Sequence, residues 1–247
     1  MGTLKKNKWV IIQDGIIQEP AIGTYEADPF LFKDYLFFEL YDYDKGVIAC
    51  RKDGKTDVVL TRPYHLSFPC VFEDKGDVYM IPETVQNRRL ELYRAKNFPY
   101  GWELVKVIKA GWFDDPIIHK FEDTFYLFTT EGENNLRVFS AKNLTDDWEL
   151  LWSDSSKQYR SAGKIFKQKD RWIRPVQDCE KRYGGGLIFY ELEGFKHKEL
   201  TRFYLDAPFT GCHTYNEGII DGRLPYDTQM DSIKHNPNLR QPPYFTA

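Results

Sequence analysis

The sequence predicts an all-β protein, and specifically a five-bladed β-propeller, from three observations. Short motifs recur after 46 or 47 residues, no stretch keeps a 3.6-residue apolar period, and 247 residues fit one all-β domain. The tripeptide Ala-Lys-Asn at 95–97 recurs at 141–143, and Trp-Glu-Leu at 102–104 recurs at 148–150. A repeat of this length is typical of a four-stranded propeller blade. A two-sheet sandwich, the structural alternative, does not explain the repeat.

The same pattern identifies four units in order along the chain. Each begins with a short apolar strand, a tight polar turn and an aromatic strand, and further strands follow. The units open near Asp28, Phe68, Asp115 and Ala162. Most of their aromatic residues alternate within strands, so we expect these side chains to pack between blades.

The fifth blade is expected to combine both ends of the chain. A last unit begins near Gly211, and the strand at residues 8–12 can complete it. Closing the ring removes exposed sheet edges, which is the physical reason to expect this pairing. We therefore predict one propeller over residues 1–226. Residues 227–247 are polar and contain proline, so we expect an extended or poorly ordered tail there.

Composition excludes several classes of function. A net charge of −3 argues against a general nucleic-acid binder, and no apolar run is long enough for membrane insertion. The four cysteines form no CxxC pair, which predicts reduced, mostly buried thiols and no zinc site. The N-terminus does not read as a signal peptide, so a cytoplasmic location is expected unless a leader has been removed. The oligomeric state is left open.

Acidic residues are predicted to gather at one rim of the propeller. The inner strands open at the same end, and two of them start with Asp-Pro. The proline has a structural reading, since a strand start needs no ladder donor there. The second strands return to this rim. Together they would bring five carboxylates to it: Asp28, Glu39, Glu83, Asp115 and Asp178.

Basic and neutral polar residues lie near these acids in the sequence. Together with the acids Glu39 and Asp178 they are candidate substrate-binding groups: His65, Arg160, Arg174, Gln177, His213 and Tyr215. Such a cluster suits recognition of sugar hydroxyls, and also acid/base chemistry on a glycosidic bond. We assign Asp28 as base or nucleophile and Asp115 as the residue that orients and tunes the pair. Glu83 is the candidate acid, because apolar neighbours would favour its protonated form. In the alternative, purely structural interpretation, Asp28 and Asp115 cap turns, and Glu39 and Glu83 lie in solvent at the ends of strands.

Several motifs carry a family resemblance over roughly residues 25–216. The runs His-Leu-Ser-Phe-Pro at 65–69, Met-Ile-Pro-Glu at 80–83 and Val-Gln-Asp-Cys at 176–179 resemble the N-terminal domain of plant glucosamine inositolphosphorylceramide transferases and their bacterial relatives. Ala-Asp-Pro-Phe at 27–30 more distantly resembles five-bladed glycosidases of the arabinanase/β-xylosidase and levansucrase type.

The glycosidase resemblance implies a base at Asp28 and a tuning residue at Asp115. It also implies a glutamic acid at the start of the fourth blade, where this chain has Ser161. The resemblance permits a divalent cation such as calcium in the channel, although no ligand spacing demands one and no other cofactor is expected.

Two functions follow for a carbohydrate or glycoconjugate ligand. The first is a glycoside hydrolase-like enzyme acting on a polysaccharide or glycolipid. The alternative is a non-catalytic glycan-binding propeller that assists a glycan-modifying enzyme.

Overall fold

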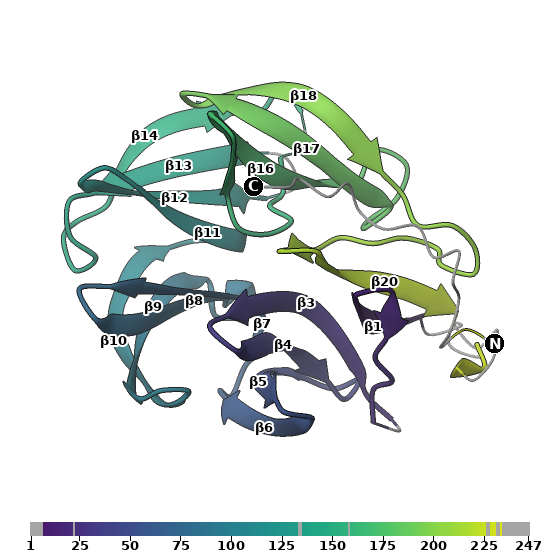
Figure 1. Cartoon of the computed structure of the whole chain (residues 1–247). Helices are drawn as coiled ribbons and strands as arrows, with labels where there is room; N and C mark the ends of the chain where they lie inside the picture. The colour runs from purple at the N-terminus through teal and green to yellow at the C-terminus, as the bar shows by residue number, and fades with distance from the viewer. Residues whose placement is uncertain are drawn as a thin grey trace.

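The chain folds as a five-bladed β-propeller, which confirms the predicted fold class (Figure 1). The computed structural model describes residues 7–21, 23–132, 135–157, 159–225, 228–230 and 233. Their strands form five antiparallel four-stranded sheets around a central axis. One short 3-10 helix, η1 (Val85–Asn87), accompanies them. No helix within these residues is long and apolar enough to span a membrane.

The first three blades are each built from four consecutive strands, running from the axis to the outer edge. Blade 1 contains β3 (Tyr25–Phe32), β4 (Tyr35–Tyr41), β5 (Gly46–Lys52) and β6 (Lys55–Leu60). Blade 2 contains β7 (Ser67–Asp74), β8 (Asp77–Glu83), β9 (Arg89–Asn97) and β10 (Tyr100–Ala110). Blade 3 contains β11 (Phe113–Phe121), β12 (Thr124–Glu131), β13 (Asn135–Ala141) and β14 (Glu149–Asp154).

Blade 4 follows the same plan, whereas blade 5 joins the two ends of the chain. Blade 4 contains β15 (Phe166–Gln168), β16 (Arg171–Asp178), β17 (Gly186–Glu193) and β18 (Lys196–Phe203). Blade 5 contains β19 (Tyr215–Asn216), β20 (Ile219–Pro225), β1 (Asn7–Gln13) and β2 (Ile16–Ile17).

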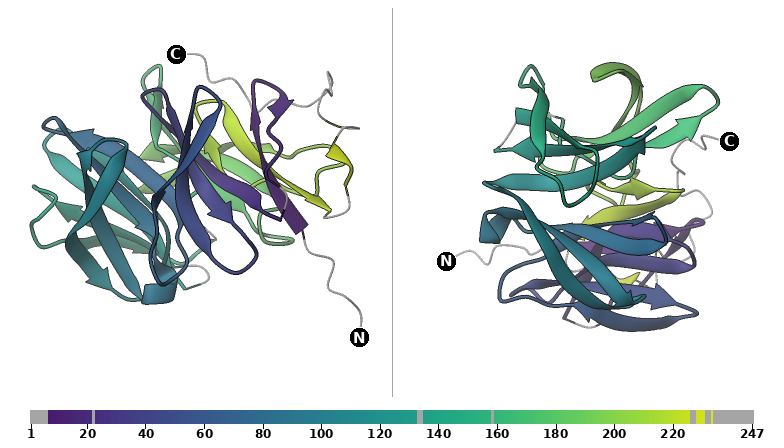
Figure 2. Two further views of the ribbon diagram at one scale, coloured as in Figure 1. Left: turned by 90° about the horizontal axis from the view of Figure 1, so that it is seen from below. Right: turned by 90° about the vertical axis from the view of Figure 1, so that its left-hand side faces the viewer.

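Closure of the ring depends on β1, which pairs antiparallel with β20 from Asn7 opposite Pro225 to Ile12 opposite Ile220. Figure 2 shows this purple N-terminal strand beside the yellow strands of the same blade. The N-terminal strand thus occupies the place that the sequence suggested. Most of the tail expected over residues 227–247 lies outside the described residues.

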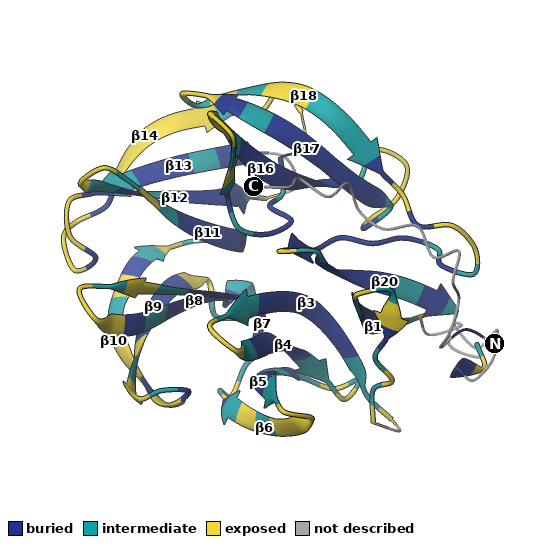
Figure 3. Cartoon of the chain, in the orientation of Figure 1, coloured by how far each residue is buried: buried dark blue, intermediate teal, exposed yellow. Residues whose placement is uncertain are grey.

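The core lies between blades, because each inner strand is covered on both faces. In β4, adjacent Phe37 and Phe38 are both fully buried although they point to opposite faces of the sheet. Phe37 packs against Trp102 of blade 2, at 6.2 Å between ring centroids, whereas Phe38 clusters with Ile11 of blade 5. Burial falls toward the outer strands, and β14 is mostly exposed (Figure 3). The aromatic residues therefore pack between blades, as expected.

Candidate functional site

The inner strands of blades 1, 2 and 3 share one backbone irregularity near their start. Asp28, Phe68 and Asp115 have φ values of 54°, 47° and 44°, and each precedes a proline. The strand register shifts at all three positions, which is the signature of a β-bulge. A left-handed residue at a bulge turns its backbone N–H out of the ladder, and proline supplies no donor. These N–H groups therefore need acceptors from elsewhere.

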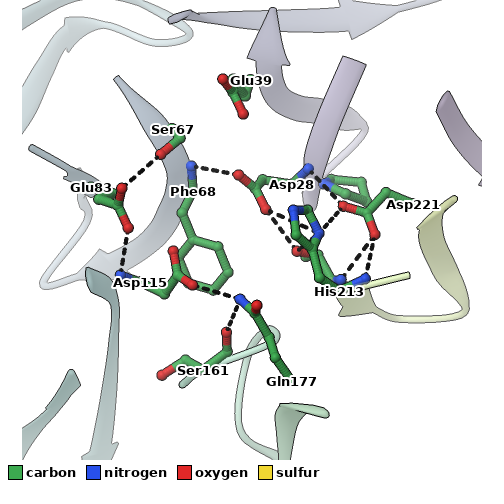
Figure 4. A network of polar contacts seen from close by, with 12 residues as sticks. Asp28, Glu39, Ser67, Phe68, Glu83, Asp115, Ser161, Gln177, His213 and Asp221 are labelled. Carbon is green, nitrogen blue, oxygen red and sulfur yellow. Dashed lines mark hydrogen bonds and ion pairs between the residues drawn. The ribbon is translucent and has the colours of Figure 1, made fainter. Parts of the chain in front are cut away.

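Carboxylates of the preceding blade supply those acceptors (Figure 4). The N–H of Asp28 donates to Asp221 Oδ2 at 3.2 Å, and the N–H of Phe68 donates to Asp28 Oδ2 at 3.2 Å. The N–H of Asp115 donates to Glu83 Oε2 at 2.9 Å. Each acid thus ties its own blade to the next, which explains why these acids gather at one end of the axis. We call the cluster Asp28, Glu39, Glu83, Asp115, Gln177, His213 and Asp221 the axial site.

One half of the axial site is a trio of charged groups. His213 Nδ1 lies 2.5 Å from Asp221 Oδ2 and 3.8 Å from Asp28 Oδ1, and Thr214 donates its hydroxyl to Asp28 Oδ1 at 2.7 Å. Burial by itself lowers the pKa of His213, but the two carboxylates raise it to about 9. Burial raises the pKa of Asp28 to about 6, with the charge of His213 acting in the opposite direction. Near neutral pH, His213 is therefore a cation beside a base candidate.

The other half is organised by Arg160, which reaches in from the start of blade 4. Its Nε donates to Asp115 Oδ2 at 2.5 Å, and its Nη2 donates to Glu83 Oε2 at 3.3 Å. Gln177 donates its side-chain amide to Asp115 Oδ2 at 2.6 Å. Burial raises the pKa of Asp115 to about 7, although Arg160 lowers it. The charge of Asp115 in turn raises the pKa of Asp28, so the two acids are electrostatically coupled.

Glu39 and His65 form a second acid–imidazole pair at the edge of blade 1. His65 Nε2 lies 3.2 Å from Glu39 Oε1, and His65 Nδ1 accepts the N–H of Gly46 at 2.9 Å. Burial raises the pKa of Glu39, and its partner His65 opposes this shift. Tyr41 packs on the His65 ring at 5.5 Å between centroids, so the pair lies beside an aromatic side chain.

The trio Asp28, His213 and Asp221 contains the acid and imidazole ligands that a divalent cation could use. Each carboxylate oxygen of the two acids, however, already accepts a hydrogen bond from the protein. Nδ1 of His213 faces Asp221, and the raised pKa of His213 keeps the ring protonated. A protonated imidazole does not bind a metal. As arranged here, the three groups form an internal ion pair, and a cation would have to displace the proton of His213.

Three predicted substrate-binding residues are engaged elsewhere. Arg174 is fully buried, and its guanidinium donates to Tyr159 O at 2.7 Å and to Ser161 Oγ at 3.0 Å. Asp178 accepts from Arg202 Nη1 at 3.1 Å, toward the outer strand of blade 4. The Tyr215 ring packs in the core beside Phe166 and Phe189.

These positions correct the predicted placement for physical reasons. The Arg174 guanidinium lies between blades 4 and 3, 5.4 Å from the Phe128 ring centre, and supports the segment on both sides of Arg160. A polar side chain at a strand end is expected to face the rim. Strand alternation instead places the Tyr215 ring in the core and turns the buried Asp178 carboxylate toward Arg202.

Sequence reasoning missed Asp221, the most connected acid of the site. Its Oδ1 accepts the backbone N–H groups of His213 at 2.8 Å and Thr214 at 3.0 Å. The available signal was an aspartate within an apolar strand, directly after Ile219 and Ile220. Such an acid is buried only when it has partners.

Comparisons with known proteins agree with the fold and locate the chain within a family. The family model of the N-terminal domain of glucosamine inositolphosphorylceramide transferase 1 matches residues 9–213. The Arabidopsis thaliana glucosamine inositolphosphorylceramide transferase 1 is 30% identical over 78% of this chain and 29% of its own length. The Oryza sativa subsp. japonica protein of the same name is 29% identical over 72% of this chain and 27% of its own. The chain thus spans under a third of these relatives.

Solved structures show the same fold at low identity. An α-L-arabinofuranosidase from Podospora anserina, in complex with cellotriose, has a TM-score of 0.64 and 12% identity. The match covers 83% of this chain and 81% of that enzyme. At this identity the likeness establishes the five-bladed architecture alone.

Proposed function

Because the chain belongs to the family of the N-terminal domain of glucosamine inositolphosphorylceramide transferase 1, we propose that it is a carbohydrate-active propeller. In this proposal the axial site acts on a glycosidic bond of a polysaccharide or glycolipid. The glycolipid option comes from the name of the relatives, and the polysaccharide option from the glycosidase fold of the structural neighbour.

One observation carries the proposal: Asp28 and Asp115 are buried, electrostatically coupled and have pKa values raised to about 6 and about 7. Proton transfer is most efficient when the pKa of the catalytic group lies near the working pH. Asp28 is the proposed base, because His213 and the Thr214 hydroxyl stabilise its ionised form. Asp115 is the proposed tuning residue, since its charge raises the pKa of Asp28.

Glu83 is the proposed acid, and its geometry sets a condition on that role. Its Oε2 contacts Arg160 Nη2 at 3.3 Å, a contact that an anionic carboxylate makes. To deliver a proton, Glu83 must first lose this partner. Arg160, whose side chain is 23% exposed, therefore has to move when substrate enters.

A second candidate function is glycan binding without cleavage. The observation that favours it is Ser161, which stands at the start of blade 4 where the glycosidase resemblance implies an acid. Ser161 is fully buried, and its hydroxyl accepts from Arg174. A binding site needs only the fixed hydrogen-bonding groups of the axial site.

The deciding experiment measures turnover and binding together. The panel contains aryl α-L-arabinofuranosides, β-galactosides, β-xylosides and glucosaminides, assayed with wild type, Asp28→Asn and Glu83→Gln. Asp77→Asn, at the exposed start of β8 after the β7–β8 turn, is the matched control. Circular dichroism and thermal melting establish that each variant is folded.

Turnover that both axial variants abolish and the control retains supports hydrolysis. Saturable sugar binding with no turnover identifies the binding function instead. If the wild-type protein shows neither turnover nor sugar binding, the proposal of a carbohydrate site is refuted. A cytoplasmic location remains a proposal as well, tested by fractionating cells that express the full-length natural protein.

A further inference from the structure

A groove of about 540 Å³ lies beside Arg160, next to blade 3. Its walls include Trp112, Asp114 and Glu131 of blade 3 and Arg160 of blade 4. Arg160 belongs to both places, because its Nε contacts Asp115 while its Nη1 lies 3.8 Å from Asp114 Oδ2. A ligand that reaches the axial acids past Arg160 therefore also touches this groove.

One wall of the groove is an exposed indole. Trp112 is 52% exposed, although large aromatic side chains are usually well buried. The guanidinium of Arg88 lies 4.4 Å from the Trp112 ring centre and covers one face of the ring. This stacking restrains the ring, so a flat apolar partner would have to contact the opposite face. The C–H face of a sugar ring is such a partner.

Two carboxylates with cationic partners also line the groove. Asp114 is 19% exposed at its side chain and is held near Arg160. Glu131 is 42% exposed and accepts from Arg137 Nε at 2.7 Å. Both carboxylates keep lone pairs free, so they can accept hydroxyl hydrogens. Their cationic partners also balance their charge, which suits a neutral ligand better than a charged one.

We propose that this groove binds the second sugar ring of a neutral oligosaccharide whose first ring lies in the axial site. The ring face stacks on Trp112, and its hydroxyls donate to Asp114 and Glu131. This inference rests on the proposed function and extends it from a single sugar to a chain. The larger cavity beside Asp178, Arg202 and Tyr204, of about 730 Å³, is not lined by Arg160, the residue that connects the groove to the axial acids.

The test compares trisaccharides with their monosaccharides by calorimetric titration. The probes are cellotriose, xylotriose and β-1,3-galactotriose, each against glucose, xylose or galactose. Proteins are wild type, Trp112→Ala and Trp152→Ala. Trp152 is the matched control because it is 37% exposed on outer strand β14 of the same blade, outside the groove. Quenching of tryptophan fluorescence on titration, absent in Trp112→Ala, reports contact with the indole.

We expect at least one trisaccharide to bind wild type about 10-fold tighter than its monosaccharide. Trp112→Ala should remove this advantage and leave monosaccharide affinity unchanged, and Trp152→Ala should retain it. Equal affinities for a trisaccharide and its monosaccharide, or full trisaccharide affinity in Trp112→Ala, refute sugar binding in the groove. Neither result refutes sugar binding in the axial site. If no sugar binds and no glycoside is turned over, the proposed function and the groove both fail.

Discussion

Replacing Asp221 with asparagine tests whether the axial acids hold the ring together. Asp221 is fully buried in β20, and both of its oxygens face N–H donors. Oδ1 accepts from the backbone of His213 and Thr214, and Oδ2 accepts from the Asp28 backbone and contacts His213 Nδ1 at 2.5 Å. Asparagine has the same shape, but one of its two positions is an NH₂ group. Either orientation of the amide then points donors at donors.

The expected cost follows from these contacts. Removing one partner of a buried ion pair destabilises a protein by about 3–5 kcal/mol. The remaining charge is His213, whose pKa is held at about 9 by Asp221 and Asp28. Without the charge of Asp221, burial dominates and the pKa of His213 falls. We therefore expect Asp221→Asn to lose about 3–5 kcal/mol of unfolding free energy near neutral pH.

Urea unfolding measures the loss of unfolding free energy, and NMR titration of the His213 ring measures its pKa. Asp77→Asn, at an exposed ion pair with Arg94, should change stability by less than about 1 kcal/mol. A loss below about 1 kcal/mol in Asp221→Asn, with an unchanged His213 titration, would show that the trio does not stabilise the fold. If the variant does not fold, the milder Thr214→Val, which removes only the hydroxyl donor to Asp28, provides the comparison.

Two further predictions concern pH and backbone geometry. The folded pKa of His213 is raised above its ordinary value of 6.5, so its stabilising contribution is complete below pH 6.5 and is lost as pH rises toward 9. Unfolding free energy should fall by about 3 kcal/mol over this window in wild type, and much less in Asp221→Asn; a rise over the window would contradict the assignment. Gly163 has φ of 142°, and a Cβ there would lie 1.9 Å from Tyr215 O, whereas Gly218 has φ of 85° and open space. Gly163→Ala should therefore lower the melting temperature far more than Gly218→Ala, which is expected to cost only about 1 kcal/mol, and equal effects would refute the predicted clash.

The fold could be predicted from the sequence because the blades repeat. The two repeats reflect similar strand positions in blades 2 and 3. Ala-Lys-Asn lies where β9 and β13 end, and Trp-Glu-Leu lies at or near the start of β10 and β14. Blade 5 has no such copy, since its strands come from both ends of the chain. Asp221 was missed for that reason, as no repeat unit marked its position.

The axial site could be predicted only in part. The Asp-Pro pairs at Asp28 and Asp115 drew attention to two acids, but Phe68 occupies the same left-handed position with no acid. The three blades thus share the backbone bulge, whereas the side chain at the bulge differs from blade to blade. Which carboxylate meets which N–H depends on contacts between blades, such as Glu83 with Asp115, and sequence spacing does not encode these contacts.

The pairing of β1 with β20 has a consequence for how the chain is made. During synthesis on the ribosome, β1 emerges before blades 1 to 4, and its partner strand β20 emerges only after them. Domains with such distant pairings fold slowly, because a long loop must close before the contact forms. Asp221 and His213 also emerge late, so the cation beside Asp28 is present only once the ring has closed. A nascent chain can thus assemble its blades one by one, yet it acquires the complete axial site only in the final step.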